Sequence, residues 1–222
     1  MKNLRFLLLL ICPLFLLTSC FDILDKIHLK ADGSGEYTII LNASKSKTRI
    51  ASIAKMGAVN GKKVPTQSEI ERKLNEAAGV FKTVPGISDV QTSADFKNYI
   101  LKLSCRFSKI ENINDGLERL KARNIIGKTI PSQLYRYDTA KKTFTRQKIS
   151  TFSEDYRKMS AADREVFTDA KYTSVLQFDL SVKSQSNRFY QLSPNRKAAK
   201  LDGAVTDFIL QKKPLQNSIV LQ

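Results

Sequence analysis

The sequence predicts an α+β fold, a single domain whose antiparallel β-sheet is built from hairpins and has helices packed on one face. Several segments alternate apolar and polar side chains with a period of two, as strands do when one face of a sheet is covered. Other segments repeat apolar residues at helical spacing. Along the chain these segments follow the order hairpin, helices, hairpin, helix, hairpin, helix and strands, which is typical of α+β proteins.

The first predicted element is a β-hairpin that begins within a few residues of Cys20. Its strands are recognised by apolar residues at every second position, which are Ile27, Leu29, Tyr37, Ile39 and Leu41. The segment 32–35, Asp-Gly-Ser-Gly, separates them, and glycine readily adopts the positive φ that tight turns need. These residues therefore predict a turn between two antiparallel strands.

Two helices are expected next. The first covers residues 44–56, with Ser44 or Ser46 as its N-cap and Ile50 and Ile53 directed inward. A loop with two glycines leads to the second helix, residues 68–84, which ends at Pro85-Gly86. Its apolar positions recur at helical spacing and are Ile70, Leu74, Ala77, Ala78 and Phe81.

The remaining elements are predicted from the same two periodicities. In chain order they are a hairpin of strands 87–92 and 96–107 with its turn at Ala94-Asp95, a helix 110–124, a hairpin of strands 134–137 and 143–146, a polar helix 153–170 with Tyr156, Met159 and Phe167 as its apolar contacts, a strand 172–182, strands 189–192 and 198–201, a helix 205–211, and a strand 218–221. No repeat or long linker divides the chain, so residues 20–222 are expected to form one domain.

Residues 1–19 have the layout of a secretory signal peptide. A basic start, Met-Lys-Asn-Leu-Arg, precedes an uncharged apolar run from Phe6 to Leu17. The run is short for a membrane-spanning helix, which needs about 20 apolar residues. It ends Leu17-Thr18-Ser19-Cys20, which resembles the lipobox of bacterial lipoproteins. The resemblance implies that the thiol of Cys20 receives a diacylglyceryl group, and that cleavage before Cys20 makes it the N-terminus and exposes an amine for further acylation. An ordinary signal peptide is the alternative.

Charge points to an anionic surface as partner. The chain carries a formal net charge of +16, and export argues against nucleic acid as the partner. Between Tyr37 and Ser68 there is no acidic residue. The basic residues of that segment are Lys45, Lys47, Arg49, Lys55, Lys62 and Lys63. The four residues Lys45, Lys47, Arg49 and Lys55 are candidates for contact with anionic lipid headgroups, and a generally basic surface is the alternative.

The sequence contains no recognisable catalytic or metal-binding constellation. Cys105 remains alone once Cys12 and Cys20 are assigned to the signal and the lipobox, so no internal disulfide is expected. It occupies the apolar register of its strand, as a buried Cys does. His28, the single His, lies on the polar side of its strand.

Acidic residues are interpreted in the same way. The segment Asp32–Glu36 lacks the alternating carboxylates of calcium loops. The acidic residues Glu111, Asp115 and Glu118 fall at helical spacing beside basic ones, which indicates a solvated helix face. We therefore expect no cofactor, no metal and no enzymatic activity.

Asp138-Thr139-Ala140 resembles a bacterial O-glycosylation sequon.

Residues 26–37, soon after the lipobox Cys, resemble the opening of a group of bacterial envelope lipoproteins. The order of elements is also similar to that of LppM-type lipoprotein domains, and this resemblance implies an α+β body with a curved sheet and an association with lipid binding. Two functions are expected. The first is a non-enzymatic interaction or structural component of the cell envelope, anchored in the outer membrane and facing the periplasm, with envelope proteins as partners. The alternative is a carrier of lipid or another hydrophobic ligand, which a cavity lined by Leu101, Leu103, Phe178 and Leu180 would favour.

Overall fold

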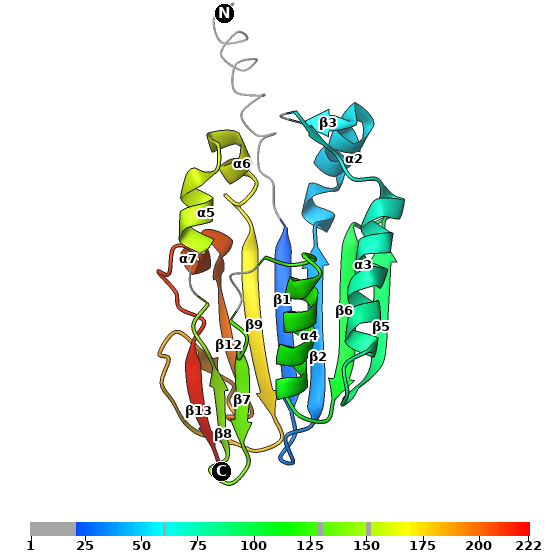
Figure 1. The fold of residues 1–222 in the computed structure, drawn as a ribbon. Coiled ribbons are helices and arrows are strands. Elements are labelled where there is room, and N and C mark those ends of the chain that lie inside the picture. The colour runs from blue at the N-terminus through cyan, green and yellow to red at the C-terminus, as the bar shows by residue number, and fades with distance from the viewer. Residues whose placement is uncertain (1–20, 60, 128–130, 150–151) are drawn as a thin grey trace, which may run out of the picture.

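The computed structural model describes residues 21–59, 61–127, 131–149 and 152–222. Seven strands form a large sheet in the order β11-β12-β9-β1-β2-β6-β5 (Figure 1). Their bounds are β1 Asp22–Leu29, β2 Gly35–Asn42, β5 Ile87–Asp95, β6 Ile100–Phe107, β9 Lys171–Phe178, β11 Gln191–Leu192 and β12 Ala198–Ala204. The prediction of an α+β domain is confirmed.

Strand β1 lies at the centre of the large sheet. It pairs antiparallel with β2, as the predicted hairpin requires, with Ile27 opposite Tyr37. It also pairs parallel with β9, from Asp22 opposite Lys171 to Leu29 opposite Phe178. The sheet is therefore antiparallel except for one central pair. The strand pattern could not reveal that pair, because side-chain alternation is the same in parallel and antiparallel strands.

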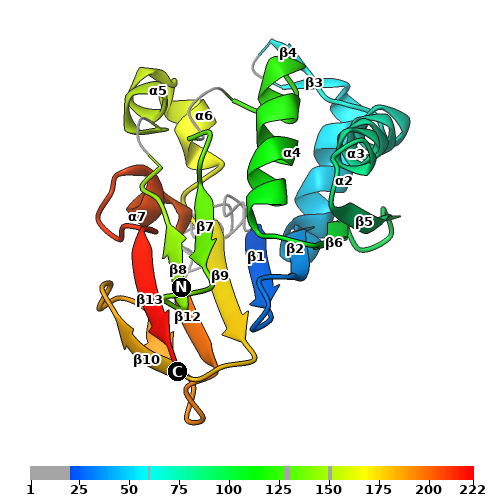
Figure 2. The ribbon, with the colours of Figure 1, turned by 60° about the horizontal axis from the view of Figure 1, so that its bottom comes forward.

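Helices cover one face of this sheet. Helix α3 (Gln67–Lys82) packs on β5, and α4 (Glu111–Ala122) lies beside it over β1 and β2 (Figure 2). Helix α3 begins with a capping box in which the Thr66 hydroxyl accepts a hydrogen bond from the Glu69 amide, and Glu69 accepts one from the Thr66 amide. Ala78 and Phe81 are buried, as predicted, so the expected packing of helices on one face is confirmed.

A second sheet covers the rest of the same face, beside α4 (Figure 2). Its strands, in the order β10-β13-β8-β7, are β10 Val182–Gln185, β13 Asn217–Leu221, β8 Thr143–Arg146 and β7 Tyr135–Asp138. Phe144 of β8 meets Phe178 of β9 with ring centroids 5.8 Å apart. One hydrophobic cluster joins both sheets, α3 and α4. The predicted hairpin of strands 134–137 and 143–146 is confirmed and forms half of this second sheet.

Three boundaries predicted from the sequence are wrong. The predicted helix 153–170 is two short helices, α5 (Phe152–Lys158) and α6 (Ala161–Glu165), because Ser160 caps a new helix by accepting a hydrogen bond from the Asp163 amide. The predicted strand 172–182 ends at Phe178, and the chain then crosses to the second sheet as β10. The turn of the second hairpin follows Asp95 rather than including it.

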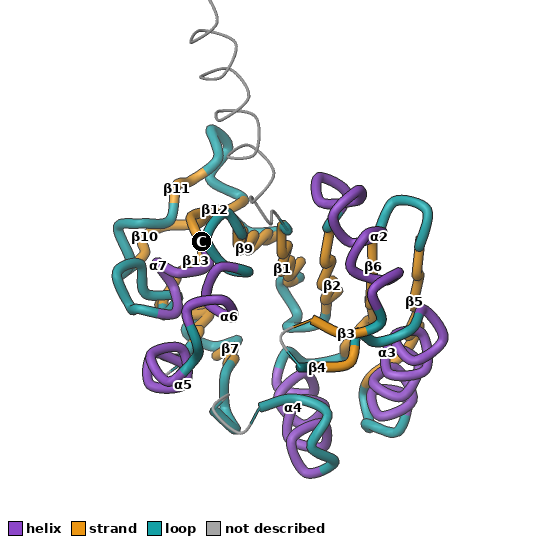
Figure 3. The backbone as a smooth tube through the Cα atoms, turned by 90° about the horizontal axis from the view of Figure 1, so that it is seen from above, coloured by secondary structure: helices purple, strands orange, loops and turns teal. Residues whose placement is uncertain are grey.

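Several elements gather at one end of the domain, which we call the N-terminal end because β1 begins there. It carries the 3-10 helix η2 (Ser44–Ser46), α2 (Lys47–Met56), the small hairpin of β3 (Ala58–Val59) and β4 (Lys62–Lys63), and the helices α5 and α6 (Figures 1 and 3). Helix α7 (Val205–Ile209) follows β12 directly, near α5. Short helices with few buried residues distinguish this end from the rest of the molecule.

Candidate functional site

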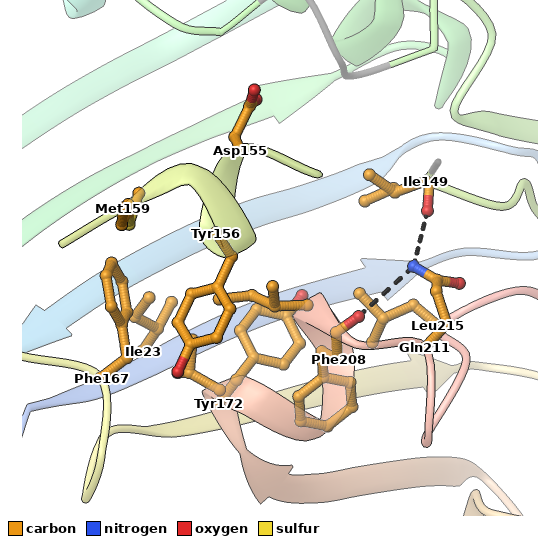
Figure 4. A pocket seen from close by; sticks show the side chains of 12 residues that line it. Ile23, Ile149, Asp155, Tyr156, Met159, Phe167, Tyr172, Phe208, Gln211 and Leu215 are labelled. Carbon is orange, nitrogen blue, oxygen red and sulfur yellow. Dashed lines mark hydrogen bonds between the residues drawn. The ribbon is translucent and has the colours of Figure 1, made fainter. Parts of the chain in front are cut away.

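A pocket of about 410 Å³ lies at the N-terminal end of the domain. Its floor comes from the first residues of strands β1 and β9, which contribute Ile23 and Tyr172. Its walls come from α5, from α7 and from residues that lie just before or after α5, α6 and α7 in the chain (Figure 4). These wall residues are Ile149, Asp155, Tyr156, Met159, Phe167, Val205, Phe208, Ile209, Gln211 and Leu215.

Aromatic contacts hold the short helices in place. Tyr156 of α5 meets Phe167, which follows α6, edge to face at 5.9 Å between ring centroids. On the other side, Tyr172 meets Phe208 of α7 at 5.1 Å. The Val205 amide donates to the Ala170 carbonyl at 2.8 Å, which ties the start of α7 to the start of β9. Isolated helices of this length are unstable in water, so these tertiary contacts determine the shape of the pocket.

Three polar side chains of the lining are bonded elsewhere or point away. The side-chain amide of Gln211 donates to the backbone carbonyls of Ile149 and Phe208, at 2.9 and 3.3 Å. The Tyr172 hydroxyl donates to Asp25 at 2.6 Å. The Asp155 carboxylate points away from the aromatic rings (Figure 4). Apart from the Tyr156 hydroxyl, the surface offered to a ligand is therefore mainly hydrocarbon and aromatic.

A buried ion pair lies on the inner face of the sheet, next to the pocket floor. Arg146 and Asp25, 2% and 4% exposed, approach to 2.9 Å. Arg146 also donates to the Ser174 and Tyr172 hydroxyls, at 2.7 and 2.9 Å, and its guanidinium stands over the ring of Tyr135 at 5.6 Å. The Tyr172 hydroxyl thus links the ion pair to the pocket.

The pKa shifts in this cluster favour a charged Arg146 and a neutral Tyr172. Burial by itself would lower the pKa of the Arg146 guanidinium, but Tyr135, Tyr172 and Asp25 together raise it well above its usual value. Burial and the charge of Asp25 raise the pKa of Tyr172 well above its usual value, although the cation of Arg146 opposes this. The ion pair is an incomplete network, because Asp25 Oδ1 and Arg146 Nε have no hydrogen-bond partner among the described residues.

The chain enters the domain at the edge of the pocket. Phe21, the first described residue, meets Phe167 edge to face at 6.2 Å between ring centroids. Its carbonyl accepts a hydrogen bond from the Lys171 amide at 2.9 Å. Two residues later, Ile23 lines the pocket. The predicted lipidation site, Cys20, precedes Phe21 in the sequence and lies outside the described residues.

The four predicted headgroup-contacting residues lie at the same end of the domain. Lys47 and Lys55 are exposed on α2, whereas Arg49 is half-buried. Lys45 forms an ion pair with Asp22 at 3.0 Å. None of the ten residues of α2 is buried, and Met56 at its end is 68% exposed. The predicted inward packing of Ile50 and Ile53 is incomplete, because α2 contacts mainly η2 and β3 rather than the core.

The other candidate residues have structural roles. Cys105 is buried, and burial raises the pKa of its thiol to about 12, so it is the small apolar residue that was predicted. His28 is not simply solvated, since its Nε2 lies 2.9 Å from Asp179. Asp32 shapes the first turn by accepting hydrogen bonds from the amide and hydroxyl of Ser34. Glu111 accepts a hydrogen bond from the Tyr137 amide at 2.9 Å, so it belongs to the α4–β7 contact.

The cavity residues named from the sequence do not line the apolar pocket. Leu103 and Phe178 are buried in the core, and Leu180 packs against that core. Ile39 and Leu41 share the inner face with buried Tyr37, as predicted, but are 37% and 36% exposed. Sequence reasoning identified Tyr156, Met159 and Phe167 as apolar contacts of a helix. It also predicted a helix at 205–211, where α7 lies, but not the place of that helix in the pocket wall. It missed the Asp25–Arg146 pair, for which the two charged positions in apolar-polar strands were the available signal.

Comparisons with known proteins do not establish a function. Within the described part of the chain, no helix is long and apolar enough to cross a membrane, and no group of three or more potential metal ligands occurs. No family model and no curated protein matches the sequence. The chain is similar in structure to the folded domain of the Mycobacterium tuberculosis LppM protein, solved by NMR. That likeness has a TM-score of 0.43 and 11% identity, and it covers 91% of this chain and 89% of that one.

Proposed function

We propose that this protein is a non-enzymatic lipoprotein of the cell envelope, anchored by acyl chains on Cys20, whose domain holds a hydrocarbon chain of a lipid in the apolar pocket. The observation that supports lipid binding is the pocket itself, about 410 Å³ of space enclosed by apolar and aromatic side chains. This observation favours the carrier function over the purely structural one.

The size and chemistry of the pocket both fit such a ligand. Protein interiors seldom contain voids larger than a water molecule, and ligand pockets usually measure about 300–1,000 Å³. Two of the polar groups in the lining, the side-chain amide of Gln211 and the Tyr172 hydroxyl, already donate hydrogen bonds within the protein. A buried methylene group contributes about 0.8 kcal/mol, so an acyl chain gains affinity with each carbon that enters.

The N-terminal end of the domain has the features of a membrane-facing surface. The basic helix α2 carries no acidic residue in its first turn and buries none of its side chains. Its exposed cations Lys47 and Lys55 lie at the end where β1 begins. Each cation near an anionic leaflet adds about 1 kcal/mol of attraction. We therefore propose that α2 lies against anionic headgroups of the outer membrane on its periplasmic side.

Binding of a fluorescent polyene fatty acid tests the carrier function. We expect residues 21–222, secreted without the lipobox, to bind the probe saturably at one site. Met159→Trp fills the pocket and should weaken binding about tenfold, because overpacking costs about 1–3 kcal/mol. Val166→Trp is the matched control, since Val166 is exposed and outside the pocket. Absence of saturable binding would leave the alternative, an interaction or structural component.

Vesicle flotation tests the membrane contact of α2. The double variant Lys47→Glu, Lys55→Glu should release the non-lipidated domain from vesicles rich in anionic lipid at low salt. The control variant Lys30→Glu, Lys141→Glu makes the same charge change in exposed turns at the opposite end of the domain. Equal flotation of both variants would contradict the contact.

A further inference from the structure

We infer that the occupant of the apolar pocket is one of the protein's own acyl chains, the lipid carried by Cys20, rather than a chain of a free membrane lipid. This inference rests on the proposed function, since it requires both a lipidated Cys20 and a pocket that binds hydrocarbon. It adds the source of the chain, and it makes the anchor and the ligand the same molecule.

The path of the main chain supports this source. Phe21 is held at the pocket by its ring contact with Phe167 and by the hydrogen bond from the Lys171 amide to its carbonyl. Consecutive Cα atoms are about 3.8 Å apart, so the attachment point of the lipid lies one residue from a side chain that packs on the pocket wall. Ile23, two residues further on, is part of the floor. Phe21 and Ile23 are thus held beside the pocket by contacts on both sides.

This tether gives the chain's own lipid an advantage over a free one. A ligand joined to its site by a short linker has an effective concentration in the millimolar range. The Cys20-linked chain pays no new cost of bringing two molecules together, which free association does. A membrane lipid of the same hydrocarbon chemistry makes the same apolar contacts without this gain.

Anchoring tolerates the withdrawal of one chain. A single acyl chain binds membranes marginally, whereas two give stable attachment. A lipoprotein with a diacylglyceryl group on its thiol and a third acyl chain on its amine therefore keeps two chains in the membrane while one occupies the pocket. The N-terminal end of the domain is then held against the bilayer, with α2 beside it.

Photocrosslinking of the full-length lipidated protein in native membranes tests the source of the chain. Cells are fed a fatty acid with a mid-chain diazirine, membranes are irradiated, and the purified protein is digested for mass spectrometry. We expect a covalent pair in which the acylated Cys20 peptide is joined to a peptide containing Tyr156, Met159 or Phe208. Reconstitution with an equal amount of ¹⁵N-labelled protein should give pairs in which both peptides have the same label.

The variants provide the matched comparison. Met159→Trp should lower the yield of the Cys20–pocket pair about tenfold, because the indole occupies the space that the acyl chain needs, while Val166→Trp leaves it unchanged. Phe21→Ala removes the contact with Phe167 and should lower the yield without affecting fatty-acid binding by the non-lipidated domain.

Each other outcome overturns the inference. Pocket peptides that carry a phospholipid mass, with no Cys20 pair, identify a membrane lipid as the occupant and leave the proposed function intact. Pocket peptides without any adduct, while the non-lipidated domain still binds the fatty acid, refute the inference that the Cys20 chain is the occupant. The proposed function is unaffected by that outcome. An unacylated Cys20, or a domain without fatty-acid binding, refutes the proposed function together with the inference.

Discussion

Two neighbouring regions on the same face of the large sheet are built from similar aromatic residues with opposite results. Where the second sheet packs on the large one, Tyr135, Phe144 and Phe178 are at most 2% exposed. Around the pocket, Tyr156 and Phe167 stay half-buried and enclose a hollow. The difference lies in the backbone, since strands are fixed by ladders of hydrogen bonds along their length, whereas helices of five to seven residues depend on their side-chain contacts. A region that depends on side chains is where a protein can keep space for a ligand.

The largest effect is expected in the buried ion pair of the packed region. Asp25→Ala leaves the Arg146 guanidinium buried without its carboxylate partner, which costs about 3–5 kcal/mol. Urea denaturation monitored by circular dichroism would measure the loss of unfolding free energy. Asp202→Ala is the control, because it breaks the exposed pair with Lys200 and should cost about 0–1 kcal/mol. Equal effects of the two variants would contradict the assigned role of the buried pair.

Removing one aromatic ring from each region compares their packing directly. Phe144→Ala should cost about 3–5 kcal/mol because Phe144 is fully buried between the sheets. Phe167→Ala should cost about 2 kcal/mol or less, as its ring faces the pocket on one side. Thermal and urea unfolding of both variants would test the ranking, and a reversed order would show that the pocket wall is the better packed region.

Adding volume gives the converse comparison. Met159→Trp extends into the pocket and should change the unfolding free energy by less than about 1 kcal/mol. Val182→Phe inserts atoms where the exposed fraction is 0% and should cost about 1–3 kcal/mol. The two variants can be compared by their urea midpoints. A large loss in Met159→Trp alone would mean that the hollow cannot accommodate extra atoms.

The smallest expected effect is a local pH dependence away from both regions. Hydrogen bonds from Lys63 and from the Thr66 amide and hydroxyl lower the pKa of Glu69 from its ordinary 4.5 to about 2. A lowered pKa adds stability above the ordinary value, and that stability is lost as the pH falls through about 2. We expect amide exchange in the first turn of α3 to rise as the pH falls from 4.5 toward 2. Glu69→Gln should remove this dependence, and an unchanged profile in that variant would assign it to another group.

Much of the fold could be predicted because local patterns carry it. The first hairpin, helices α3 and α4 and the β7–β8 hairpin follow from alternation, helical spacing and turn residues, all of which act between near neighbours in sequence. One error concerns a local N-cap that was assigned to the interior of a helix, and another concerns a long-range strand pairing. Ser160 begins a new helix within the predicted segment 153–170, and the chain leaves the large sheet after Phe178 to pair β10 with β13.

The candidate site was only partly predictable. Tyr156, Met159 and Phe167 were recognised as apolar. Phe208 and Ile23, which line the same pocket, come from segments far away in the sequence. Arg146 appeared as one polar residue of a strand, and nothing local indicates that it is buried against Asp25. Its burial depends on the second sheet folding over the first, which is a long-range event.

The sequence by itself determined the periodicity of the strands and helices and the apolar register of Cys105, and it predicted the export signal with Cys20 that the proposed anchoring requires. Only the tertiary structure decided that β1 pairs parallel with β9, that two charges meet in the interior, and that α5, α7 and the segments beside them surround an apolar space near Phe21. The physical reason is the sequence separation between the residues that interact. Periodicity, capping and turns depend on residues within a few positions of one another. A pocket depends on how segments that are far apart in the sequence come together and on the space that they leave unfilled.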